Sequence, residues 1–177
     1  MSFIELMIDD KNKSGALAGG DLDPDDTEAL SQLAAGSVGE AFRLTNLDGL
    51  ALYREIVALF AGLPRLNRAR ALGLAEAAAQ KGNEEQFDLT LALIEIFLTR
   101  LSRAAATRLT PPEAAVNEAA LFARLAPYAG SSLIWAELAQ SLTQRARRAK
   151  AVNLDPAALV MDILLKIEAT AASVIAG

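Results

Sequence analysis

Signals that begin and end helices recur along this chain, and they constrain its fold more than any other feature. Residues that commonly cap helix N-termini stand directly before apolar stretches at several points, namely Asp23, Asn67, Ser131 and Asp155. Proline follows the first and the last of these at once, in the position where a helix tolerates it best. No stretch alternates polar and apolar residues for long enough to indicate a strand. The sequence therefore predicts an all-α helical bundle.

The expected helices follow from these signals and from apolar residues spaced three and four apart. In chain order they cover residues 24–36, 37–45, 48–61, 67–81, 83–107, 110–127, 131–150 and 155–173. Asn83 with Gln86 resembles a capping box, and Thr110-Pro111-Pro112-Glu113 resembles a helix start.

A change in composition near residues 46–49 predicts a boundary between two parts. We interpret residues 17–46 as a two-helix remnant of a small domain and residues 47–177 as one helical domain of ordinary size. The polar stretch at 1–16 differs from the rest, and we interpret it as a non-native or disordered leader outside the fold.

Composition excludes several function classes. The chain has no cysteine and no histidine, which removes thiol chemistry, the commonest general base and the commonest metal ligand. Its formal net charge is −5, which does not favour binding to a nucleic-acid backbone. The most apolar stretch, residues 89–98, is shorter than the roughly 20 residues of a membrane span. We expect a cytoplasmic protein with no catalytic residue, no metal and no cofactor.

A glycine-containing turn, LAAGSVGEAFRL at residues 33–44, superficially resembles a phosphate-binding loop. Such a loop requires a preceding strand and a lysine after its last glycine, whereas here a helix precedes the turn and Glu40 follows Gly39. We therefore interpret Gly36, Ser37 and Gly39 as a tight turn between helices.

Other polar groups have ordinary structural interpretations. The basic run of Arg145, Arg147, Arg148 and Lys150 stands at a predicted helix C-terminus, where positive charge is favourable, and a subsidiary contact to a partner is the alternative. The acidic run at residues 21–26 lacks the spacing of a calcium loop and suits a helix start. Trp135 is expected in the core.

Two predicted helices are apolar on more than one side. In 83–107, one stripe comprises Phe87, Leu91, Ile94, Leu98 and Leu101, and a second comprises Leu93, Ile96 and Phe97. In 155–173, Met161 and Leu165 extend the main stripe, which includes Val160, Ile163, Leu164 and Ile167. Such a helix is either central in its bundle or part of an interface. The candidate subunit interface consists of Val160, Ile163, Leu164 and Ile167.

Two segments together resemble one protein family. LAAGSVGEAFRL is similar to the lid motif of AAA+ clamp-loader subunits, and NLDPAALVMDILLKIEA is similar to the last collar helix of the bacterial DNA polymerase III delta-prime subunits. Between them, GLALYREIVALFAGLP and FDLTLALIEIFLTRLSRAA fit the helical layout of the same family. The resemblance spans about residues 17–172.

The resemblance implies an architectural role. Nucleotide-binding relatives carry an arginine where this chain has Gly39, in keeping with a subunit that does not hydrolyse ATP. Residues from 47 onward would form a collar domain that contacts the delta and gamma/tau subunits, with DNA reached only indirectly. The exposed interface of an isolated fragment could also lead to self-association. The alternatives are the gamma/tau collar itself, a ligand-binding helical bundle and a small acidic adaptor.

Overall fold

A computed structural model describes residues 23–34, 43–45, 47–80, 84–152 and 154–177. Within these ranges every regular element is a helix and no strand occurs, which confirms the all-α prediction. The helices are α2 (Pro24–Ala34), α4 (Gly49–Phe60), α5 (Arg68–Ala78), α6 (Glu84–Thr107), α7 (Glu118–Leu125), α8 (Ser131–Ala151) and α9 (Pro156–Ala176). Arg43, Leu44 and Thr45 are also helical.

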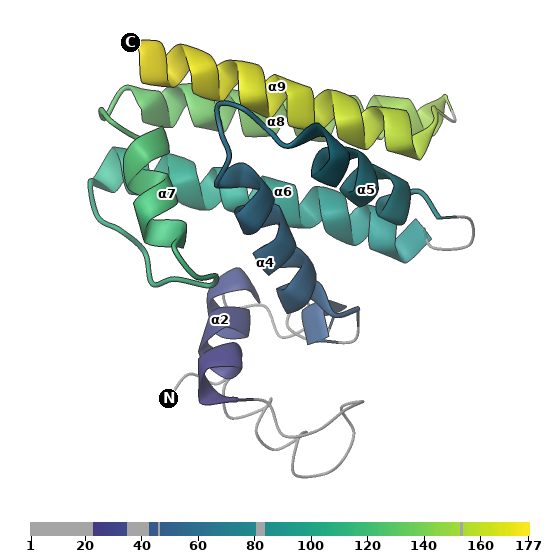
Figure 1. Ribbon diagram of the computed structural model, residues 1–177, viewed down its shortest axis with the longest axis horizontal. Coiled ribbons are helices and arrows are strands. Elements are labelled where there is room, and N and C mark those ends of the chain that lie inside the picture. The colour runs from purple at the N-terminus through teal and green to yellow at the C-terminus, as the bar shows by residue number, and fades with distance from the viewer. Residues whose placement is uncertain (1–22, 35–42, 46, 81–83, 153) are drawn as a thin grey trace.

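The long helices α6, α8 and α9 lie side by side, while α4 and α7 cross them and α2 lies beyond α4 (Figure 1). Helix α6 is central, since it contacts α4, α5, α7 and α8. Phe97 of α6 stands at the middle of this arrangement, with its ring edge-on to Phe60 of α4 and Phe122 of α7, at centroid distances of 4.9 and 5.3 Å. The two-sided apolar pattern of α6 is thus the pattern of a central helix.

Two helix starts form as their sequences predict. Asn67 accepts a hydrogen bond from the backbone N–H of Arg70 at 3.1 Å, which caps α5. Asp155 accepts from the N–H groups of Ala157 and Ala158, both at 3.3 Å, with Pro156 at the first position of α9.

The predicted helix over 110–127 is wrong in its first half. Helix α7 begins only at Glu118, and residues 108–117 form a loop that precedes it. Asn117 has a left-handed backbone conformation with φ 66°. A helix that ran without interruption from Thr110 would not contain a residue in this conformation. The proline pair therefore belongs to the loop.

The predicted boundary near residues 46–49 does not interrupt the core. Leu30 and Leu33 of α2, together with Leu44, belong to the same buried apolar cluster as the helices after residue 47. Gly49 permits this close approach, because a Cβ atom there would stand 2.9 Å from the backbone Cα and O of Leu44. Arg54 of α4 and Asp26 of α2 add an ion pair at 2.5 Å.

Candidate functional site

The four candidate interface residues on α9 lie in the core. Val160, Leu164 and Ile167 have no exposed surface, and Ile163 is 2% exposed. The reason is that α9 packs against α5, α7 and α8 at once, so its main apolar stripe is enclosed by its own chain. We correct the prediction accordingly and assign these four side chains to the core, since an enclosed side chain cannot contact a partner.

A second apolar stripe on α9 is largely exposed, although Met161 within it is half-buried against the core. It consists of Ala158, Met161, Leu165, Ala172 and Ile175, and we call it the outer stripe. Leu165 and Ile175 are 40% and 41% exposed. The steps of three, four and seven residues place these side chains on one side of the helix, as in the seam between packed helices. In the sequence, Met161 and Leu165 extend the apolar face of this helix beyond its main stripe. That extension is the sequence feature from which this exposed surface could be predicted.

The turn residues of the lid-like motif, Gly36, Ser37 and Gly39, lie outside the described residues. Their described neighbours are Ala34, the last residue of α2, and Arg43, the first residue of the helical stretch 43–45.

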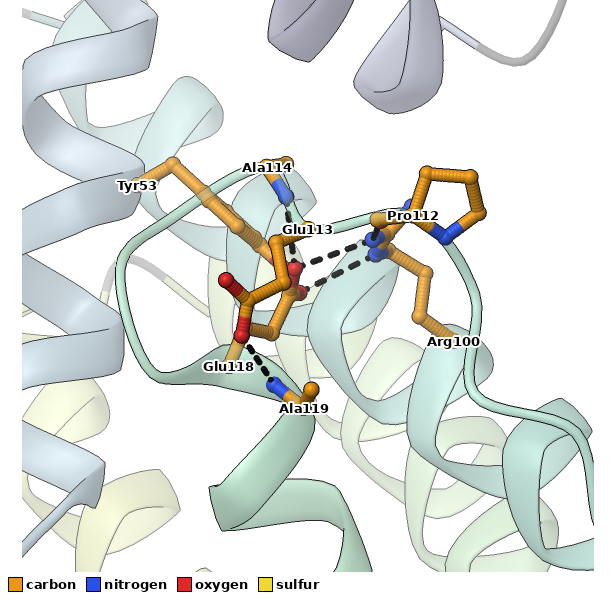
Figure 2. A network of polar contacts seen from close by, with 7 residues as sticks. All are labelled: Tyr53, Arg100, Pro112, Glu113, Ala114, Glu118 and Ala119. Carbon is orange, nitrogen blue, oxygen red and sulfur yellow. Dashed lines mark hydrogen bonds and ion pairs between the residues drawn. The ribbon is translucent and has the colours of Figure 1, made fainter.

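A buried polar network joins α4, α6, α7 and the loop before α7 (Figure 2). Its centre is the carboxylate of Glu118, which is 1% exposed. Arg100 donates from Nε and Nη2 to the two carboxylate oxygens at 3.1 and 2.9 Å. Ala114 donates its backbone N–H at 2.8 Å, and the Tyr53 hydroxyl donates to Oε1. Arg100 also donates to the carbonyl of Pro112 at 2.6 Å.

The hydrogen bonds of this network serve to hold the fold together. Each oxygen of Glu118 already accepts two hydrogen bonds, so the carboxylate has little capacity left to act as a general base. Arg100 neutralises its charge and is itself largely buried, with a side chain 11% exposed. The arrangement fixes the loop before α7 against α4 and α6.

Burial raises the pKa of Tyr53 well above its usual value, and the nearby Glu118 carboxylate raises it further. The folded protein therefore keeps the phenol proton, whereas the unfolded chain loses it above about pH 10. Because the unfolded state then binds fewer protons than the folded state, the free energy of unfolding falls as the pH rises above about 10. Below about pH 10 the contribution of Tyr53 to stability is complete.

We expect Tyr53→Phe to reduce this alkaline loss of stability by up to about 1.4 kcal/mol per pH unit above pH 10. Chemical denaturation at a series of pH values between 8 and 11 measures the effect. Tyr128→Phe is the matched control, since that side chain is 40% exposed. If stability depended on pH in the same way in wild type and Tyr53→Phe, the raised pKa of Tyr53 would not be the cause of the alkaline loss.

The other polar groups singled out in the sequence have structural places. Arg145 lies 2.6 Å from Asp162 of α9, and Lys150 forms an ion pair with Asp88 of α6, so the basic end of α8 is tied to both neighbouring helices. Trp135 is fully buried, as predicted, and donates its indole N–H to the carbonyl of Leu125 at 2.8 Å.

A hollow of about 820 Å³ lies between α2, α6 and the Pro111-Pro112 turn. Ala34 and Arg43, which line it, flank residues 35–42, so the described residues do not define its full outline. Of the cations that line it, Arg100 is already engaged by Glu118. We therefore assign no ligand to this hollow.

Within the described ranges, no three His, Cys, Asp or Glu side chains converge as a metal site would require. Nor does any helix among these residues combine the length and apolarity needed to cross a membrane.

No protein family model, no curated protein and no solved structure matches the chain.

Proposed function

We propose that this chain is the collar part of a delta-prime-type subunit of the bacterial DNA polymerase III clamp loader, in which it holds the subunit in the ring that loads the sliding clamp. Its role is to bind the delta and gamma/tau subunits, and it reaches DNA only through the assembled loader. The order of the lid-like and collar-like motifs along the chain supports this proposal. The all-helical architecture is compatible with it.

One observation carries the proposal furthest. The collar-like segment NLDPAALVMDILLKIEA contains the start of α9, whose inner face closes the bundle while its outer stripe stays exposed. A surface helix usually places polar residues on its exposed side, so an apolar outer stripe indicates a surface that a partner covers. Gly39, which offers no side chain to a nucleotide, supports the non-hydrolysing member of the family.

The test is a charge introduced into the outer stripe. We expect Leu165→Glu to weaken binding to one loader subunit by about tenfold or more, because it buries a carboxylate without a partner in the contact. Its free energy of unfolding should change by less than about 0.5 kcal/mol, since the side chain is 40% exposed in the free chain. Calorimetric titration with purified delta and gamma/tau, alongside thermal unfolding, measures both quantities.

Val116→Glu is the matched control, because Val116 is 80% exposed and lies in the loop before α7. It should leave binding unchanged. If Leu165→Glu lowered stability and binding in equal measure, α9 would be a core helix alone. If wild type bound neither subunit, the alternative of a helical adaptor unrelated to replication would gain support.

A further inference from the structure

A groove runs between the antiparallel helices α6 and α8. At one end, the hydroxyl of Ser102 on α6 donates to the carbonyl of Ser132 on α8 at 2.8 Å. At the other end, Lys150 of α8 forms an ion pair with Asp88 of α6. Between these two ties the surface is hollowed by about 200 Å³.

Small side chains explain the hollow. Ala92 of α6 and Ala139 and Ala146 of α8 line it, and larger residues in these places would fill it. Its floor is apolar and rigid, because it is made of core side chains that are themselves buried: Ile94, Leu98, Leu142 and Ile163. A buried floor beneath an open mouth gives a preformed site for an apolar group.

The size of the groove indicates its occupant. Sites for small molecules and cofactors usually measure about 300–1,000 Å³, which is more than this groove offers. A single aliphatic or aromatic side chain that anchors a protein partner needs much less space, and such anchors fill preformed pockets at the centres of interfaces. The groove therefore suits a protein partner.

The rim adds charges of opposite sign on opposite walls. Glu95 is exposed on the α6 wall and Arg147 on the α8 wall. Among the residues that the structure describes, neither has a hydrogen-bond or ion-pair partner, whereas Asp88 and Lys150 are paired with each other. A complementary partner would present a cation towards Glu95 and an anion towards Arg147.

A closed ring of related subunits requires two different surfaces on each member, because its contacts are head-to-tail. The groove and the outer stripe of α9 share no residue. We infer that the groove is the second subunit contact: it receives one apolar side chain from a helix of a neighbouring loader subunit, with flanking charges that meet Glu95 and Arg147. This inference rests on the proposed function and assigns its second surface.

The first test fills the groove. Ala146→Leu places a larger side chain at its partly buried wall, and we expect about tenfold weaker binding to one of the two subunits, delta or gamma/tau, with the other affinity retained. Ala136→Leu is the matched control, since it makes the same change at an exposed position of α8 outside the groove. Calorimetric titration of this chain with each full-length subunit gives the two affinities separately.

The second test reverses one rim charge. Arg147→Glu should weaken binding to the same subunit by about tenfold, with a smaller loss at high salt. Arg148→Glu is the control, because it alters the adjacent exposed residue that does not line the groove. Since Arg147 and Arg148 are both exposed in the free chain, these two variants should unfold at nearly the wild-type temperature, which thermal unfolding checks.

The outcomes separate the two proposals. Selective loss of one subunit in Ala146→Leu and Arg147→Glu, but not in their controls, supports the groove as a contact. Wild-type affinities for both subunits in these variants would overturn the groove and leave the proposed function standing. Equal weakening towards both subunits would also overturn the groove as a separate surface. A wild-type chain that binds neither subunit would overturn both proposals.

Discussion

Glu118→Ala is expected to lower the free energy of unfolding by about 3–5 kcal/mol. The substitution leaves the Arg100 guanidinium buried without its counter-charge, and it removes the acceptor for the Ala114 N–H and for the Tyr53 hydroxyl. Each group stranded in this way loses its interaction without regaining water. Urea denaturation followed by circular dichroism measures the loss, which is a large fraction of the stability of an ordinary domain.

Two comparisons test the cause of this loss. Glu55→Ala removes an exposed carboxylate from α4 and should cost less than about 0.5 kcal/mol. The double variant Glu118→Leu with Arg100→Met should be more stable than Glu118→Leu alone, because no unpaired charge then remains buried. A single Glu118→Ala variant as stable as wild type would show that the network contributes nothing to the fold.

Phe97→Ala is expected to cost about 3–5 kcal/mol as well, for a different reason. Its ring is fully buried between those of Phe60 and Phe122, so truncation opens a cavity where α4, α6 and α7 meet. The surrounding rings come from three separate helices and cannot all move inward to fill the space, which places the expected value in the upper part of the range for large-to-small changes.

Thermal and chemical unfolding of Phe97→Ala measure this effect, with Leu133→Ala as the control. Leu133 is 63% exposed, so its truncation removes little buried apolar surface. A loss below about 1 kcal/mol in Phe97→Ala would mean that the junction of the three helices is packed more loosely than the ring geometry indicates.

The helical architecture was predictable from local signals. Asn67 and Asp155 each combine a capping side chain with a following apolar repeat, and both cap their helices as expected. Ser131 is an exception: Gly130 holds the N-cap position of α8 without a side-chain cap, and the Ser131 hydroxyl donates to the carbonyl of Tyr128 at 2.6 Å. These signals act within one turn of the chain, which is why the sequence alone identifies them.

The start of α7 was not predictable in the same way. Thr110-Pro111-Pro112-Glu113 has the composition of a helix start, but long-range contacts hold this stretch as a loop. The carbonyl of Pro112 accepts from Arg100 of α6 at 2.6 Å. A signal for the network nevertheless existed: Glu118 precedes Leu121, Phe122 and Leu125 with the spacing of one buried helix face.

The candidate interface illustrates another limit of periodicity. The pattern identified which residues of the last helix are apolar, but it could not determine which of two apolar sides the rest of the chain encloses. Packing against α5, α7 and α8 decides this, so Ile163 and Leu164 are core residues while Leu165 remains exposed. The groove between α6 and α8 could not be predicted from the sequence either, since it depends on how these two helices pack against each other.

The most direct test of the proposed collar role is light scattering after gel filtration of this chain mixed with full-length delta and gamma/tau subunits. The account predicts one mixed complex of defined stoichiometry that contains this chain, and weaker incorporation of one subunit into it when Leu165 is replaced by glutamate. Separate peaks for all three proteins at micromolar concentration would contradict it.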